Sequence, residues 1–353
     1  MTVARGGAPI PSELRAYLRQ PETKPRLAAL QGPAPRAFLA GVALNYGVIA
    51  ISIYACMLSV SSWWLVLVYP LVLLTIGARQ HALLILMHDA THYLAARNRT
   101  LNEWLGEILT AAPMFVSMQN YRANHLAHHQ QLNTNEDPDW IRKIQPEDER
   151  DYWIFPAQKR AVHLFFALYK RSIGYLIRSL RDNSKNDPAQ RKRSETEHRI
   201  VRTRNLLYLA TIALLSYTGT WLHFITLWIA PTLLVLPMLM RLRSIAEHFA
   251  LPHDHPLRES RNIRPGYIER FFLAPHNIGA HLDHHIVASV PVNNLSALHE
   301  LLMECDYFRS NAHNNDGYLI GGNSLVQDMY RTPSARLPNR VDSRPTLGDA
   351  AVA

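Results

Sequence analysis

The sequence predicts an all-α integral membrane protein, in which two transmembrane helical hairpins with four spans in total carry a cytoplasmic helical cap. Two segments, 37–78 and 205–240, contain no Asp, Glu, Lys or Arg. As continuous helix they would be ~63 and ~54 Å long, about twice the ~30 Å hydrocarbon core of a bilayer. A hydrophobic content of 48% with a mean hydropathy of only −0.11 indicates that a large polar part accompanies the spans.

Each uncharged segment is expected to form two spanning helices joined by a tight turn, because lipid offers no partner for bare backbone groups. In the first hairpin we expect helices near Phe38–Leu58 and Trp63–Met87. In the second we expect them near Leu206–Thr218 and Trp221–Met240, with the turn at Gly219. Two buried hairpins in a large soluble protein are the less favoured alternative, since ~18 uncharged apolar residues already indicate a membrane span.

The charges that flank the hairpins predict their orientation. Residues 1–37 carry six Lys and Arg residues and the segment 181–204 is also strongly basic, whereas the turns inside the hairpins are uncharged. The positive-inside rule therefore places both termini and the segment between the hairpins in the cytoplasm. No signal peptide is expected, because the segment before the first span is polar. The expected organisation is an N-terminal cytoplasmic segment (1–37), the first hairpin (38–87), a cytoplasmic segment (88–204), the second hairpin (205–240), a further cytoplasmic segment (241–330) and a disordered tail (331–353).

The cytoplasmic segment between the hairpins contains a second membrane-related pattern. Apolar residues recur at helical spacing over Arg160–Leu180, with basic residues on the other side. This pattern predicts an amphipathic helix, which either lies in the headgroup layer of an anionic leaflet or forms an ordinary half-buried helix of the cap. Residues 182–204 resemble a solvated linker.

The net charge of +9 comes without a basic recognition motif, so nucleic acid is not an expected partner.

The histidines are clustered at the spacing of a helix face. His88 and His92 are four residues apart, and the motif His-x-x-His-His occurs twice, at 125–129 and at 281–285. Because positions i, i+3 and i+4 share one face of a helix, each cluster can direct two or three imidazoles at one point. His248 follows the fourth expected span by about two turns. We therefore expect nine histidines to converge just below the membrane surface.

Nine imidazoles are too many for one ion and enough for two, so the cap is predicted to hold a histidine-rich di-metal site. Imidazole is a ligand for iron, copper, zinc and nickel. The His-Glu-x-x-His motif of zinc metalloproteases is absent from the sequence. A pair of irons held by nitrogen at a membrane surface favours oxygen chemistry on a lipid-like substrate.

Polar residues near the clusters are candidates to orient the ligands, because a metal-bound imidazole commonly donates its other N–H to a carboxylate. Five carboxylates lie inside or beside the clusters: Asp89, Asp137, Asp139, Glu247 and Asp283. Of these we favour Glu247 and Asp137. Asn277, four residues before His281, is a candidate to hold a water or an imidazole.

Four other histidines are not expected to be ligands. His253 and His255 lie between two prolines, which argues against a helical face. His81 lies one or two turns deeper in the membrane than His88 and is expected to make a buried polar contact. His223 lies on the far side of the membrane in the predicted topology.

The motifs HDATH (88–92), NHLAHH (124–129) and HLDHH (281–285), in this order around two apolar hairpins, resemble those of the membrane fatty-acid desaturase family. The flanks NTNEDPDW (133–140) and VASVPVNNLSALHELL (287–302) are also similar to the family's flanks. The resemblance covers roughly residues 40–305. It implies four transmembrane helices, a cytoplasmic cap and a non-haem di-iron site. It carries the role of iron ligand to His88, His92, His125, His128, His129, His281, His284 and His285, and less firmly to His248.

The function implied by this resemblance is that of an O2-dependent desaturase, which introduces a double bond into the acyl chain of a lipid at two iron ions. A hydroxylase or ketolase of the same superfamily is the alternative, acting on an acyl chain, sphingolipid, carotenoid or alkane, because both outcomes begin with the same hydrogen abstraction. A metal transporter or storage protein is a third reading.

No His-Pro-Gly-Gly haem segment is present and two cysteines cannot hold an iron–sulfur cluster. A separate electron donor of the ferredoxin or cytochrome b5 type is therefore expected.

Overall fold

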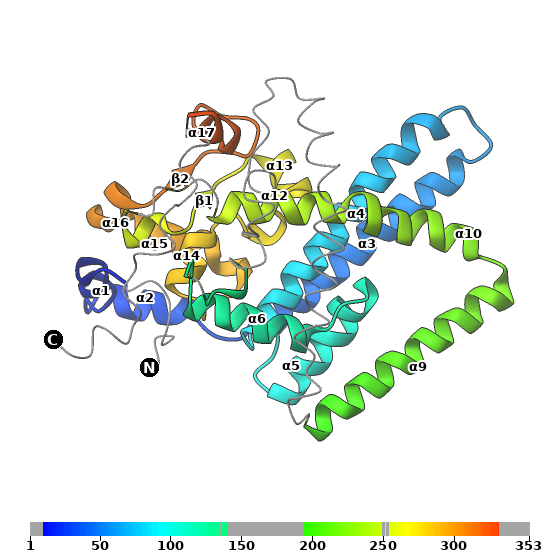
Figure 1. Cartoon of the computed structure of the whole chain (residues 1–353), viewed down its shortest axis with the longest axis horizontal. Helices are drawn as coiled ribbons and strands as arrows, with labels where there is room; N and C mark the ends of the chain where they lie inside the picture. Colours follow the sequence, from blue (N-terminus) through cyan, green and yellow to red (C-terminus); the bar gives the residue numbers. More distant parts are fainter. Residues whose placement is uncertain (1–9, 135, 140–193, 249–250, 252–253, 332–353) are drawn as a thin grey trace.

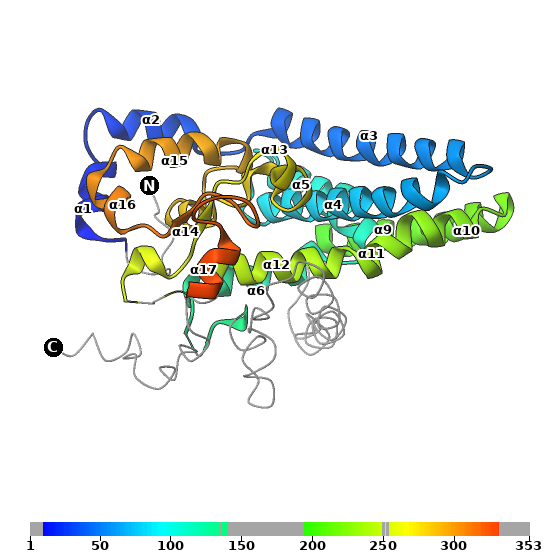
Figure 2. The same ribbon diagram turned by 90° about the horizontal axis from the view of Figure 1, so that it is seen from above.

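The computed structural model of the chain describes residues 10–134, 136–139, 194–248, 251 and 254–331. Their fold is almost entirely helical and has two parts (Figure 1). Long helices extend to one side, and short helices gather around their other ends (Figure 2). We call this gathering the head, meaning the described residues of 10–34, 92–139 and 254–331. The predicted amphipathic helix Arg160–Leu180 lies outside the described residues, as does the predicted tail beyond residue 331.

The first predicted hairpin is present as two long neighbouring helices, α3 (Pro35–Ser59) and α4 (Leu65–Thr91). Helix α3 begins with Pro35 at its first position, where the missing N–H of proline costs nothing. Helix α4 continues four residues beyond the predicted end at Met87, so His88 lies in its last turn and His92 follows directly as the C-cap residue. Both helices are long and apolar enough to cross a membrane.

The second uncharged segment forms an open V in Figure 1. Its first arm is α9 (Glu195–Thr218), and its second arm runs from Trp221 to His248 through four consecutive pieces. These pieces are α10 (Trp221–Phe224), the π-helical turn η4 (Ile225–Ile229), α11 (Ala230–Leu234) and α12 (Leu236–His248). The predicted turn at Gly219 is confirmed, since this residue has a φ of +67°. The second arm ends eight residues later than predicted, so His248 is part of the helix rather than two turns beyond it.

The predicted start of α9 near Leu206 is wrong, because the helix begins at Glu195 inside the expected linker. The reason is local: the Ser194 hydroxyl accepts from the N–H of Glu197, whose carboxylate accepts from the N–H of Ser194. This reciprocal capping box satisfies two otherwise free backbone donors. The charged first turns leave 14 uncharged residues in α9, ~21 Å of helix against a ~30 Å core.

Among the described helices, three are therefore long and apolar enough to span a membrane: α3, α4 and the arm Trp221–His248. The fourth span and the cytoplasmic position of the head stay predictions.

The head is built from short elements that surround the inner end of α4. Before the second uncharged segment they are α1 (Ser12–Leu18), α2 (Thr23–Leu30), α5 (Arg99–Gly106), the π-helical turn η1 (Glu107–Ala111), the 3-10 turn η2 (Ala112–Met114) and α6 (Met118–Gln130). After it they are η5 (Pro256–Arg258), β1 (Asn262–Ile263), α13 (Tyr267–Phe272), η6 (Pro275–Asn277), α14 (His281–Ile286), η7 (Val292–Asn294), α15 (Leu295–Met303), α16 (Asp306–Asn311), β2 (Asn314–Asn315) and α17 (Leu325–Arg331). The strands β1 and β2 pair in parallel, with Asn262 opposite Asn314.

The burial of α4 shows how the head encloses its inner half. Val66, Leu67 and Leu71 are exposed, whereas every residue from Ile76 to Thr91 is buried. A helix that is apolar but surrounded on all sides belongs to a protein core or a membrane. The head therefore encloses the inner half of α4, and His88 in its last turn is shielded from water.

Candidate metal centre

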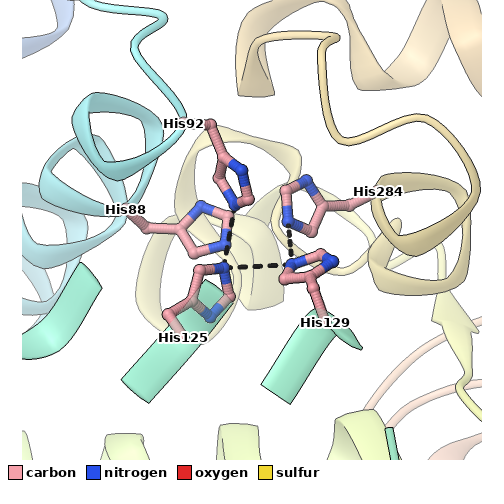
Figure 3. A group of neighbouring side chains, drawn as sticks. All are labelled: His88, His92, His125, His129 and His284. Atoms are coloured by element: carbon pink, nitrogen blue, oxygen red, sulfur yellow. Dashed lines mark hydrogen bonds between the residues drawn. The ribbon is translucent and has the colours of Figure 1, made fainter. Parts of the chain in front are cut away.

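The structure brings the nine candidate histidines together and divides them into two groups. The first group has five members, His88, His92, His125, His129 and His284. The second group has four members, His128, His248, His281 and His285. Within each group one ring nitrogen from every histidine lies within 4.8 Å of the others. In Figure 3 the rings of the first group point toward one another from α4, α6 and α14.

Each His-x-x-His-His motif directs two of its three imidazoles at one point, which is the lower of the two numbers that the sequence allowed. In α6, His125 and His129 join the first group and His128 joins the second. In α14 the assignment is reversed, because His281 and His285 join the second group and His284 the first. The physical reason is helix geometry: positions i and i+4 are separated by ~40° around the axis, whereas i+3 and i+4 are ~100° apart.

The nitrogen separations fit the edges of metal coordination polyhedra. In the first group, the Nε2 atom of His125 lies 2.9 Å from that of His92 and 3.1 Å from that of His129, which lies 3.1 Å from that of His284. In the second group, the Nε2 atom of His281 lies 3.0 Å from those of His248 and His285. Two nitrogens bound ~2.1 Å from an ion at a right angle would be ~3.0 Å apart.

Protons alone cannot satisfy this arrangement. A neutral imidazole carries either an N–H or a lone pair at Nε2, so at most two of the three consecutive Nε2–Nε2 contacts in this chain of four rings can be hydrogen bonds. His88 has no exposed surface, and neither of its ring nitrogens has a hydrogen-bond partner among the described residues. Buried polar atoms are nearly always paired, so these nitrogens are consistent with metal ligation. The donor set itself, nitrogen from imidazole, suits iron, copper and zinc.

Burial also keeps the imidazoles in the form that binds metal. Burial, followed by neighbouring imidazoles, holds the pKa of His125, His129, His281, His284 and His285 well below the usual value. Burial, and then the positive charge of Arg122, lowers the pKa of His92 to about 3. Only the neutral imidazole offers a lone pair to a metal, so these rings are ready to bind at neutral pH.

Oxygen atoms behind the second group orient two of its rings and lie near a third. His128 donates from Nδ1 to the carboxylate of Asp137 at 2.9 Å, and the backbone N–H of Asn133 donates to the same carboxylate at 2.9 Å. His248 donates from Nδ1 to the backbone oxygen of Glu259 at 3.2 Å. A carboxylate oxygen of Glu247 lies 3.4 Å from Nδ1 of His281, longer than an ordinary hydrogen bond. The predicted contact of Asp137 is confirmed, and Glu247 lies beside its histidine.

Three of the other polar candidates have different partners. Asp89 accepts from the backbone N–H of Val292 at 3.1 Å. Asp283 accepts from Nδ1 of His299 at 2.7 Å, and its neighbouring histidines lie in the metal groups without it. Asn277 donates to the backbone oxygen of Val292 at 3.3 Å. None of these three contacts reaches a histidine of either group. The contacts connect separate segments of the chain instead, so the hypothesis that these carboxylates and this amide orient metal ligands through them is wrong.

Three of the four histidines that were not expected to be ligands are described in the structure, and these three lie outside both groups. His255 faces the hydroxyl of Tyr307 at 2.9 Å, and its Nδ1 accepts from the N–H of Leu257. His81 is buried in α4, but the expected polar contact is absent, since neither ring nitrogen has a hydrogen-bond partner among the described residues. His223 lies in α10, and His253 lies outside the described residues.

Sequence reasoning missed Arg122, which joins the first two histidine clusters. From α6 its guanidinium donates to the backbone oxygens of Ala90 and Thr91, at 2.9 and 3.0 Å, and pairs with Glu103 at 2.7 Å. These carbonyls end α4, where a helix leaves its last acceptors free. The signal in the sequence was a charged residue three positions before His125, on the same helix face.

Comparisons with known proteins agree with this site. The family model described as fatty acid desaturase matches residues 61–314. Dihydrorhizobitoxine desaturase of Bradyrhizobium elkanii is 29% identical over 293 residues, which cover 80% of this chain and 79% of the relative. The sn-1 oleoyl-lipid 12-desaturase of Synechocystis is 27% identical, covering 62% of this chain and 63% of the relative. The sn-1 acyl-lipid omega-3 desaturase (ferredoxin) of Synechocystis is 25% identical, covering 70% of each.

Proposed function

The chain belongs to the fatty acid desaturase family and is an oxidoreductase, and from this premise we propose that it is an O2-dependent desaturase of lipid acyl chains. The observation that carries the proposal is the division of nine histidines, seven buried and two half-buried, into groups of five and four. Five and four nitrogen ligands are enough for two ions, and two adjacent ions suit the oxidation of an unactivated methylene. The double bond would form in an acyl chain held next to these groups.

The ligands of the proposed di-iron centre would be the nine histidines: His88, His92, His125, His129 and His284 for one ion, and His128, His248, His281 and His285 for the other. Two bound irons would supply the activation of O2 that organic side chains cannot provide. The chain's own residues hold the ligands still. Asp137 fixes the tautomer of His128 so that its Nε2 lone pair would be free to bind a metal, and Arg122 fixes the end of α4 against α6.

The burial of the site supports a reaction that must exclude water. His88 and His284 have no exposed surface, and His128 and His248 are 2% exposed. A site closed to water prevents loss of a reactive oxidant to side reactions, and it holds one C–H bond in place. An apolar chain entering from the bilayer would reach the site without crossing water.

A lipid substrate is supported by two of the relatives, whose names are those of acyl-lipid desaturases. A desaturase of a smaller, non-lipid substrate is the second candidate. It is favoured by the relative from Bradyrhizobium elkanii, which covers 80% of this chain and by its name acts on dihydrorhizobitoxine. The names of two relatives include ferredoxin, which supports a separate ferredoxin-type donor for this chain as well.

We also propose that α9 forms the fourth span and that the head lies in the cytoplasm. Arg199, Arg202 and Arg204 lie in the first turns of α9, at the end that approaches the head. Arg204 pairs with Glu107 of η1 at 2.6 Å. Basic residues at the end of a short span can reach the interface with their long side chains, which lengthens the effective span.

Mass spectrometry of total lipids from a host with and without this chain tests the function. The expected result is a loss of two hydrogens from one class of acyl chain, with no such change for a chain carrying His284→Ala. New hydroxyl or keto groups in place of double bonds would contradict desaturation. An unchanged lipid profile, together with a desaturated small molecule, would support the second candidate instead.

A further inference from the structure

A patch of exposed apolar side chains lies on the head next to the long helices. It consists of Tyr267, Ile268 and Phe271 of α13 and of Leu319 and Ile320 in the turn before α17. Tyr267 is 90% exposed, and Ile268 and Ile320 are 72% and 71% exposed. We call these five residues the α13 surface. Contiguous exposed apolar residues on a protein usually mark a contact with a membrane or another molecule.

The structure builds this surface by turning the one acidic residue of α13 inward, while Asp316, three residues before Leu319, is exposed. Glu269 is 6% exposed, and its carboxylate accepts from the backbone N–H groups of Tyr318, Leu319 and Ile320 at 2.7 to 3.0 Å. These three bonds hold the turn against α13, so its two apolar side chains stand beside those of the helix. The negative charge is thereby hidden from the surface.

The exposed charges that flank α13 are positive. Arg264 precedes the helix by three residues and Arg270 lies within it, and both are exposed. Tyrosine, aliphatic side chains and arginine together are typical of segments that lie at the boundary between water and hydrocarbon. Basic residues there are attracted to the anionic headgroups of the cytoplasmic leaflet.

The position of α13 matches the level at which the long helices enter the head. Phe272 and Leu273 pack against Ala78 of α4 and against Val235 and Leu239 in the second arm. Both long elements change their exposure at this level. Helix α4 is exposed at Leu71 and fully buried from residue 76 onward, and the second arm is exposed at Leu234 but has only buried and half-buried residues from 235 onward. Figure 2 shows α13 at this junction, between the long helices and the rest of the head.

We propose that the α13 surface lies in the headgroup layer of an anionic bilayer and seats the head on the membrane that α4 and the second arm cross. Lipid, rather than a soluble partner, is the occupant because the surface continues the lipid-exposed faces of these helices and its flanks are basic. The proposal rests on the membrane-spanning character of these helices and not on the reaction. Its test measures how close the α13 surface lies to the lipid headgroups, so the result does not depend on whether the chain is a desaturase.

The test uses the full chain in nanodiscs of phosphatidylcholine and phosphatidylglycerol, with one chain per disc. Cys56 and Cys305, both buried, are replaced by alanine. A single cysteine is then placed by Ile268→Cys or Ile320→Cys and labelled with a small fluorophore. The matched control is Arg309→Cys in α16, an exposed site at the far end of the head from the long helices (Figure 2). The quencher is a lipid that carries a nitroxide near its headgroup.

Quenching at 268 and 320 is expected to be several-fold stronger than at 309, and to weaken when Arg264→Glu and Arg270→Glu are combined. Equal quenching at 268 and 309 would overturn the proposal. So would a fluorophore at 268 that becomes shielded only when a second chain is added to the disc, because the surface would then bind another copy. Iron content and solubility in detergent serve as controls that each variant is folded.

Discussion

Replacing Asp137 with asparagine tests whether this carboxylate orients a metal ligand or is only a buried structural group. Asp137 is 1% exposed and accepts from His128 at 2.9 Å and from the N–H of Asn133 at 2.9 Å. Asp137→Asn keeps the volume but removes the charge. One oxygen accepts from the N–H of Asn133 and the other from the N–H of Asp139, so in either orientation the new NH2 group faces a donor. Loss of such an outer contact typically weakens metal binding ~10- to 100-fold, or ~1.4 to 2.7 kcal/mol. Because His128 belongs to the group of four, only the second ion should be lost.

Asp283→Asn is the matched control. Asp283 is also fully buried and also accepts from a histidine, His299, at 2.7 Å, but that histidine lies outside both groups. The assay is the iron content of each purified variant during titration with a chelator. Asp137→Asn is expected to release one iron at a lower chelator concentration than the parent chain, and Asp283→Asn to release none early while unfolding at a lower temperature. Equal chelator profiles for the two variants would refute the assignment of Asp137.

Three further predictions concern single residues. His284→Ala should abolish oxidation of the substrate while the chain still inserts in the membrane, whereas His255→Ala should keep most activity; the lipid profile of expressing cells distinguishes them. Arg122→Met should cost ~3 to 5 kcal/mol of stability, because it leaves Glu103 buried without its partner, and adding Glu103→Gln should restore part of the loss in a thermal unfolding measurement. Burial lowers the pKa of the folded His276 ring to about 4, whereas the pKa of this ring in the unfolded chain is ~6.5. As the pH falls, the unfolded chain therefore binds a proton at His276 before the folded chain does. The contribution of His276 to the free energy of unfolding is thus present above pH ~6.5 and lost toward pH 4. His276→Asn should flatten the fall in melting temperature over that range, and an unchanged slope would contradict the assignment.

The sequence predicted which histidines meet but not how they are divided. The spacing of His125, His128 and His129 places all three near one face of a helix, and that much holds in the structure. Whether position i+3 turns to the same ion as i+4 depends on where α14 crosses α6, which is a tertiary property. The same limit applies to Asp283: its place between His281 and His284 suggested an orienting role, but its carboxylate points to His299.

The helix boundaries show a second limit, because they were predicted mainly from where charged residues are absent. The uncharged segments located α3, α4 and the second arm, because long apolar helices dominate the pattern. They misplaced the start of α9, since the charged residues after Ser194 were read as linker although the capping signal S-E-T-E was present in the sequence. Arg122 was missed for a different reason: its partners are backbone oxygens of α4, and no sequence pattern reports which carbonyls a distant side chain will reach.

The central claim is that nine histidines from four helices hold two iron ions beside the membrane. The most direct measurement is the metal content of the full chain, purified from cells supplied with ample iron, combined with the same measurement on His281→Ala. We predict two irons per chain for the parent and one for the variant, because His281 is a member of the group of four only. Fewer than two transition-metal ions per parent chain, or an unchanged content in the variant, would contradict the claim.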